Sequence, residues 1–275
     1  MKNLFSDLSE YFPFARSVIQ RRMSYKIGFL MRIIGGLLQV LIMYYLWMAI
    51  FNSSTTGQIK GFTSAEMVIY IVISYITSQV ININIEGIIS FEIRDGSIAV
   101  NLIRPISYKK RILAESLGEV MLRSATVLLP LWIGFVIYKF VTIRELPPNI
   151  GTILLFLFSL FLGYMIMFLF NFIFGLSAFF VTYIWGFMMC KGVILKFFSG
   201  ELIPIVFFPS AVQKVLQYLP FSSINYTPVM IYMEKFTASE LVSALLIQAI
   251  WVVILFVTMN VLWKSAIKRL TVLGG

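Results

Sequence analysis

Apolar residues occupy most of the chain in long blocks that short polar segments separate. An α-helix needs about 20 apolar residues to cross a bilayer core about 30 Å thick, and six blocks come close to that length. They are residues 29–50, 67–86, 118–138, 151–174, 177–198 and 241–263. The fourth and fifth blocks come from one apolar run that is too long for a single span, so we divide it near Asn171–Gly175. The pattern predicts an all-α polytopic membrane protein with six transmembrane helices.

The composition agrees with this class. Of the 275 residues, 60% are hydrophobic and 12% are charged, whereas a soluble domain has about half apolar and about a quarter charged residues. Cys190 is the single cysteine and there is no histidine, which excludes an internal disulfide and a zinc site of His and Cys within the chain. No phosphate-binding loop, zinc-peptidase motif or serine-hydrolase motif occurs. We therefore predict no catalytic, cofactor-binding or metal-binding residue, and no enzymatic activity, for this chain.

The 22 basic residues indicate the orientation, because Lys and Arg concentrate in cytoplasmic loops. Fifteen of them lie in the leader, around the segment after the second span, or in the tail, and five lie in segments on the opposite side. Both termini are therefore expected in the cytoplasm, as an even number of spans requires. The net charge of +10 is explained as a topology signal, so we expect a lipid bilayer as the partner surface and no nucleic acid.

Residues 1–26 are predicted to form an amphipathic helix along the cytoplasmic leaflet. Apolar residues recur at helical spacing from Leu4 onward, and Pro13 is expected to kink the helix. The transmembrane domain follows at 27–263, and residues 264–275 are predicted to be a cytoplasmic tail.

The segment 87–117 is predicted to be the main cytoplasmic loop. Ser97 is expected to cap a short helix within it. On that helix Ile98 and Leu102, spaced i,i+4, would be apolar residues without a span to occupy. The segment is either a solvated loop or a docking element for a cytoplasmic partner. The docking residues would be Arg94, Asp95, Gly96, Ser97, Ile98, Leu102 and Arg104.

The outer segment 199–240 is too rich in proline for one helix and too apolar for a solvated loop. Backbone that does not span persists at membrane depth only where it packs in protein or lines a cavity. We predict a re-entrant pair of short helices in the outer leaflet, one of them capped by Ser210. The turn residues would be Gly200, Pro204, Pro209 and Pro220.

Polar residues recur at helical spacing along the second span. They are Tyr75, Ser78, Gln79, Asn82 and Glu86. Because such groups are costly in lipid, they are expected to face the bundle or a cavity. They would form helix–helix hydrogen bonds, a translocation path or a subunit seam. Elsewhere, Glu119 and Arg123 are expected to pair at i,i+4, and Lys191 is expected to snorkel outward or meet a polar partner.

Several motifs resemble the signature of ABC-2-type transporter permeases. In the outer segment they are Phe198–Pro204 (FSGELIP), Phe208-Pro209, Leu219-Pro220-Phe221 and Tyr226–Val229 (YTPV). Residues 91–97 (FEIRDGS) and 102–105 (LIRP) resemble the cytoplasmic loop of a bacterial subgroup of this family, and the resemblance extends over essentially the whole chain.

The resemblance implies a permease subunit of an ATP-binding cassette exporter in the bacterial cytoplasmic membrane. Such a subunit pairs with a second permease, either a homologous chain or itself, and with cytoplasmic ATPase subunits that bind ATP and Mg²⁺. The interfacial helix and the loop between spans two and three would contact the ATPases. Family substrates include drugs, peptides, lipids and polysaccharides, usually exported.

The alternative function is an energy-independent membrane carrier or an accessory membrane anchor. A carrier is expected to show internal repeats and ionisable residues near the midplane of the membrane. The sequence has no evident repeat, and its charges cluster at the ends of the spans. The sequence therefore favours the permease.

Overall fold

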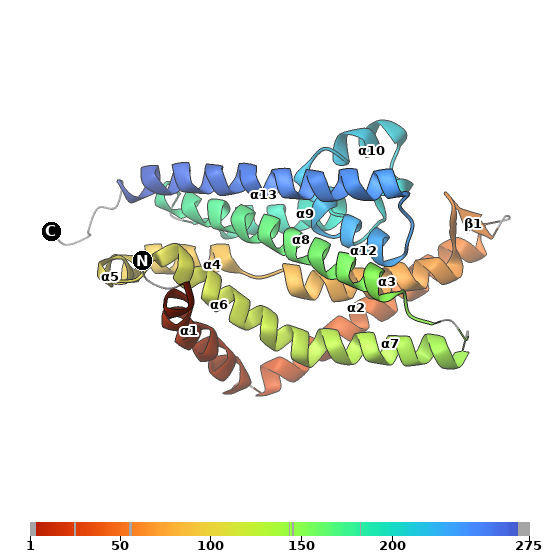
Figure 1. The fold of residues 1–275 in the computed structure, drawn as a ribbon, viewed down its shortest axis with the longest axis horizontal. Coiled ribbons are helices and arrows are strands. Elements are labelled where there is room, and N and C mark those ends of the chain that lie inside the picture. The colour runs from red at the N-terminus through yellow and green to blue at the C-terminus, as the bar shows by residue number, and fades with distance from the viewer. Residues whose placement is uncertain are drawn as a thin grey trace.

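The chain folds almost entirely into helices in a computed structural model, which confirms the predicted all-α class (Figure 1). The structure describes residues 4–24, 26–54, 57–142, 144, 146–181 and 183–268. The first three residues of the predicted interfacial helix and the last seven of the predicted tail lie outside the described residues.

Long helices form the body of the molecule. They are α1 (Leu4–Ser24), α2 (Lys26–Asn52), α3 (Ser64–Ile81), α6 (Tyr108–Arg123), α7 (Leu129–Thr142), α8 (Ile150–Leu176), α9 (Trp185–Phe198) and α13 (Ala238–Ile267). A π-helical turn, η1 (Ser124–Leu128), joins α6 to α7.

Shorter elements connect these helices. They are α4 (Ile85–Arg94), α5 (Ser97–Ile103), α10 (Ser210–Leu216), α11 (Pro220–Ile224), α12 (Tyr226–Tyr232), and the 3₁₀ turns η2 (Ser177–Phe179) and η3 (Ile205–Phe207). Strands β1 (Gln58–Ile59) and β2 (Phe62–Thr63) form a small antiparallel hairpin in which Ile59 faces Phe62.

Five helical stretches of the described residues are long and apolar enough to cross a membrane. They are Ile33–Asn52, Ser64–Arg94, Tyr108–Val141, Ile150–Phe179 and Ala238–Ile267. They overlap the first four predicted spans and the sixth, and they establish a polytopic membrane protein. In place of the predicted fifth span there is α9, whose 14 residues give a helix about 21 Å long, shorter than a bilayer core. The count of six spans therefore stays a prediction.

Helix α8 is the centre of the fold, and α3, α4, α12 and α13 pack against it. Figure 1 shows α13 running beside α8, with α5 and the last turns of α13 at one end of the bundle and the β1–β2 hairpin at the other. At the α5 end, Tyr108 stacks on Trp263 with ring centroids 5.1 Å apart, and both rings contact Phe172. Aromatic pairs of this kind contribute packing energy beyond the area that they bury.

Helix α1 lies against α6 and continues through Pro13 as one helix. The two helices approach closely at Gly118, where a Cβ would lie 2.5 Å from the carbonyl oxygen of Ala15. The hydroxyl of Tyr11 accepts a hydrogen bond of 3.0 Å from the backbone N–H of Ser107. The buried face of α1 is thus used against protein, while Phe12 on the other face is exposed.

Candidate functional site

The second apolar segment, Ser64–Arg94, is interrupted after Ile81. Helix α3 ends at Ile81 and α4 begins at Ile85. Asn84 caps α4, because its Oδ1 accepts a hydrogen bond of 3.0 Å from the N–H of Gly87. Asparagine favours such caps over helix interiors. The stripe expected from regular helical spacing between Tyr75 and Glu86 therefore does not follow one helix.

Side chains from two other helices satisfy the backbone at this break. Arg123 of α6 donates from Nη1 to the carbonyl oxygens of Asn82, at 2.8 Å, and Gln79, at 3.4 Å. Asn171 of α8 donates to the carbonyl of Ile83 at 3.0 Å. Carbonyls freed within a membrane require partners of this kind, because lipid supplies none. The break is therefore built into the fold.

A buried ion pair lies beside the break. Lys191 of α9 donates to Oε1 of Glu86 and, at 2.7 Å, to Oδ1 of Asn171. Lys191 and Glu86 are 8% and 7% exposed. Among the described residues, Oε2 of Glu86 has no hydrogen-bond partner. Lys191 thus meets a polar partner, one of the two outcomes expected from the sequence.

Glu119 connects the break to the N-terminal helix. Arg123 donates from Nη2 to Glu119 at 2.6 Å, which confirms the predicted i,i+4 pair. Arg22 of α1 binds the other oxygen of Glu119 at 3.1 Å. A continuous polar chain therefore runs from α1 through Glu119 and Arg123 to the carbonyl of Asn82.

The outer segment reaches the same break from the opposite side. Asn82 donates from Nδ2 to Glu201 at 3.2 Å, and Tyr70 of α3 donates to the carbonyl of Gly200 at 2.5 Å. Of the predicted polar stripe, the site contains Gln79, Asn82 and Glu86. Tyr75 and Ser78 are buried, and Ser78 donates only locally, to the carbonyl of Tyr75.

Sequence reasoning missed several members of this cluster. They are Arg22, Asn84, Asn171 and Glu201. Asn84 and Asn171 each gave a usable signal, because each lies in an apolar stretch where an unpaired amide is costly.

The segment 87–117 differs from its prediction at Ser97. Gly96, with φ of 79°, occupies the cap position of α5, and Ser97 is the first helical residue. Ser97 donates from N and from Oγ to Oδ1 of Asp95, at 3.0 and 2.7 Å. These hydrogen bonds hold the pKa of Asp95 below its ordinary value. The turn at 95–97 is therefore fixed, but not by a Ser97 cap.

The expectation that Ile98 is exposed is also wrong, and Leu102 is only partly exposed. Helix α5 folds back on α4, so Ile98 lies in the core with 1% of its surface exposed, and Leu102 packs against that core. The exposed apolar residues of α5 are Val100 and Ile103, at 54% and 84%. Helical spacing predicted one face of α5 correctly as a contact face, but the chain itself already covers that face.

The predicted turn residues of the outer segment all lie at element boundaries. Gly200 has φ of 84°, Pro204 precedes η3, Pro209 precedes α10, and Pro220 is the first residue of α11. Ser210 begins α10 and does not cap it, since Pro209 occupies the cap position. That the segment enters the outer leaflet stays a prediction.

The fold and the site define a polytopic helical membrane protein whose second crossing is broken at a buried polar cluster. A protein-family model described as "ABC-2 family transporter protein" matches residues 37–274 of the chain. The chain therefore belongs to the ABC-2 family of transporter proteins. No curated protein matches the sequence. Family membership supports the role of a permease subunit in an ATP-binding cassette transporter.

Proposed function

We propose that the chain is the permease subunit of an ATP-driven exporter in the bacterial cytoplasmic membrane, with both termini in the cytoplasm. It pairs with a second permease subunit, either a homologous chain or a copy of itself. Separate cytoplasmic ATPase subunits bind ATP and Mg²⁺. We call the turn at 95–97 between α4 and α5 the elbow. The observation that carries the proposal is that α4 joins this elbow directly to the break in the second span.

Helix α4 forms this connection, because it begins at the break and ends at the elbow. Arg111 of α6 binds Glu92 of α4 at 2.6 Å, and Tyr108 donates to the same carboxylate at 2.9 Å. Glu86 in the first turn of α4 holds Lys191. A displacement of the elbow therefore moves α4 as a rigid helix and reaches the break at its other end.

The proposed docking surface is the exposed side of this elbow. Val100 and Ile103 supply the apolar contact, and the exposed Asp95 and Arg104 supply the polar rim. Arg94, whose guanidinium lies over the ring of Tyr183, belongs to the same rim. In this arrangement Ile98 and Leu102 attach α5 to the bundle, while Gly96 and Ser97 form the turn that presents it.

The predicted polar stripe takes a narrower role in this proposal. Gln79 and Asn82 are only partly buried, so they remain accessible to a substrate or to the second permease subunit. Tyr75, Ser78 and Glu86 are internal, and they position the helices around the break.

Co-purification tests the docking surface. Replacing Ile103 with Asp would place a charge in the apolar contact, so we expect recovery of the ATPase with the permease to fall at least tenfold. Leu146→Asp is the matched control, because Leu146 is also a highly exposed apolar residue and lies in the α7–α8 connection. Recovery with Leu146→Asp should equal that of the wild type. Equal recovery with both variants would exclude this docking surface.

A second experiment separates the permease from a self-sufficient carrier. The purified chain in liposomes should neither hydrolyse ATP nor move substrate, and both activities should appear when the ATPase subunits and ATP are added. Transport by the chain alone would favour the alternative of an energy-independent carrier.

A further inference from the structure

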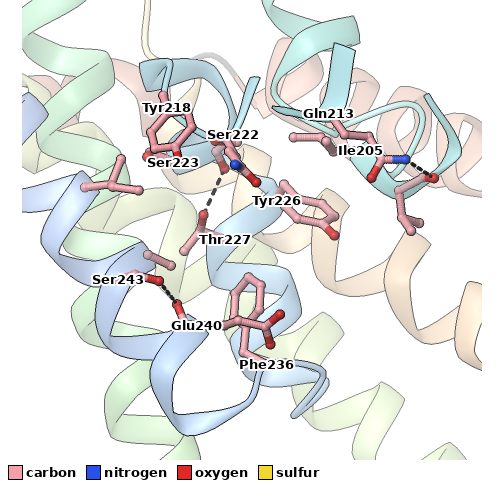
Figure 2. Close-up of a pocket in the computed structure, with 14 residues that line it drawn as sticks. Ile205, Gln213, Tyr218, Ser222, Ser223, Tyr226, Thr227, Phe236, Glu240 and Ser243 are labelled. Carbon is pink, nitrogen blue, oxygen red and sulfur yellow. Dashed lines mark hydrogen bonds between the residues drawn. The ribbon is translucent and has the colours of Figure 1, made fainter. Parts of the chain in front are cut away.

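A cavity of about 380 Å³ lies between the outer segment and the start of α13 (Figure 2). One wall is α10 with its C-cap residue, which contribute Gln213 and Gln217, one turn apart. The opposite wall is the first turns of α13, which contribute Glu240 and Ser243. A cavity of this size, with apolar surfaces and a few convergent polar groups, has the form of a small-molecule site.

Four of the eight lining residues that carry a hydroxyl or an amide have already used their side-chain hydrogens on backbone carbonyls, namely Gln213, Ser222, Thr227 and Ser243. Nε2 of Gln213 donates to the carbonyls of Val206 and Phe208, each at 2.8 Å. Figure 2 shows two further bonds of this kind, from Thr227 to the carbonyl of Ser222 at 3.2 Å and from Ser243 to the carbonyl of Glu240 at 2.9 Å.

These four groups therefore face a ligand only as acceptors. A primary amide has two N–H donors, so Gln213 has only its Oε1 left, and each of the three hydroxyls has spent its one hydrogen. The side chains of Gln217, Tyr218, Ser223 and Tyr226 keep their donors, because none of them makes a hydrogen bond within the described part of the chain. The neutral groups thus offer both donors and acceptors, and the charge of the lining decides which ligand it favours.

Glu240 is the one charged residue among the fourteen described residues that line the cavity. Its Oε2 accepts hydrogen bonds from N and Oγ1 of Thr237, both at 2.8 Å, in the capping box that starts α13. These bonds fix the carboxylate. Among the described residues, no hydrogen bond reaches the other oxygen, Oε1. The described lining therefore carries one negative charge, on an exposed carboxylate in a set position, and no positively charged side chain.

Aromatic rings complete the site. Tyr226 and Phe236 meet edge to face with ring centroids 6.4 Å apart, and Tyr218 also lines the cavity. Gly200 makes the position of Tyr226 possible, since a Cβ on Gly200 would lie 2.8 Å from the Cβ of Tyr226. The negative faces of such rings attract cations and cover apolar groups.

We propose that this cavity binds an organic ammonium ion, with the N–H donors directed to Glu240 and the acceptors and the apolar body against the aromatic rings. An anion is disfavoured, because it would face a carboxylate without a counter-ion. A neutral polyol would satisfy the acceptors but would gain nothing from the charge. The site lies within one chain and does not depend on the proposed function.

Three probes of similar shape test the charge requirement. They are 2-phenylethylammonium, 2-phenylethanol and phenylacetate, which are cationic, neutral and anionic at pH 7. Each is titrated by saturation-transfer NMR against the purified full-length chain in lipid nanodiscs, with empty nanodiscs as the blank. We expect the ammonium to bind at least tenfold more tightly than the alcohol, and phenylacetate not to bind. Equal affinities, or binding of phenylacetate, would overturn the proposal.

Two variants and one control locate the binding. Glu240→Gln retains a side chain that can complete the capping box, so α13 should still start normally, while the preference for the ammonium over the alcohol should fall below threefold. Ala244→Phe fills the cavity from α13 and should abolish binding of all probes. Glu234→Gln changes a carboxylate outside the cavity and should bind as the wild type does. Unchanged ammonium binding in Glu240→Gln or in Ala244→Phe would overturn the proposal.

Discussion

Lys191 and Glu86 form a buried ion pair that joins α9 to the first turn of α4. On α9, Lys191 and Leu195 are the buried residues among those described, so this pair is a principal attachment of α9 to the bundle. Helix α9 also leads directly into the outer segment at Ser199–Gly200. The pair therefore connects α4 to the segment 199–240, which forms one wall of the cavity at Glu240.

Breaking this pair should destabilise the protein strongly. Lys191→Met leaves the Glu86 carboxylate buried without a counter-ion, which costs about 3 to 5 kcal/mol. Adding Glu86→Gln removes the charge, so the double variant should recover part of the loss. Thermal unfolding midpoints of both variants in one detergent measure the effect. Lys214→Met, at an exposed position on α10, is the control and should change stability by about 0.5 kcal/mol or less. Equal midpoints for Lys191→Met and Lys214→Met would contradict the structural role of the pair.

Two asparagines with the same local chemistry allow the function of the break to be separated from stability. Asn84 caps α4 at the break, and Asn149 caps α8 through a hydrogen bond of 2.9 Å from the N–H of Thr152. Replacing either with Ala removes one cap and costs about 1 kcal/mol. Transport by the assembled transporter should fall much more for Asn84→Ala than for Asn149→Ala, because only Asn84 shapes the break. Equal transport by the two variants would mean that the break has no part in transport.

The class of fold and most of the membrane-crossing helices could be predicted from the sequence, because each depends on the length and polarity of a continuous block. The pair Glu119–Arg123 could be predicted for a similar reason, since its geometry is set by a single helix. The position of the break after Ile81 could not be predicted from the sequence. Apolar residues continue on both sides of it, and the donors that stabilise it, Arg123 and Asn171, come from other helices.

The burial of Ile98 is a second case in which a distant contact decides. Its i,i+4 spacing with Leu102 correctly indicates that the two residues share a face. Whether that face meets solvent, a partner or the same chain depends on the turn at Gly96, which folds α5 onto α4. The two asparagines at 82 and 84, so close together in an apolar block, were the local sign of the break.

Cysteine labelling tests the orientation. In a chain in which the exposed Cys190 has been replaced by Ser, single cysteines are introduced at Ser53, Leu146 and Arg104, all exposed positions. With the cytoplasmic termini predicted from the basic residues, an impermeant maleimide added to intact cells should label the first two sites and not Arg104→Cys. All three should react after permeabilisation, which controls for accessibility. Labelling of Arg104→Cys in intact cells would contradict the orientation.

Gly200 is the position where the outer segment should tolerate substitution least. Its φ of 84° lies in the left-handed region, which costs a residue with a Cβ about 1 to 2 kcal/mol. The new methyl group would also lie 2.8 Å from the Cβ of Tyr226 and 2.9 Å from the hydroxyl of Tyr70, and overpacking adds about 1 to 3 kcal/mol. Gly200→Ala should therefore destabilise the protein by about 2 to 5 kcal/mol. It should also displace Tyr226 from the wall of the cavity at Glu240.

Gly192→Ala is the matched control for this substitution. Gly192 lies within α9, and a Cβ added there would meet no atom within 4 Å among its described neighbours, so alanine should be neutral or stabilise the helix by up to about 1 kcal/mol. Thermal midpoints of the two variants, measured together with 2-phenylethylammonium binding, distinguish the outcomes. Gly200→Ala should lower both quantities, because the turn and the wall of the cavity share the same close contact. A Gly200→Ala protein as stable as Gly192→Ala would show that the outer segment adjusts its turn without loss, and the rigid link between Gly200 and Tyr226 would have to be abandoned.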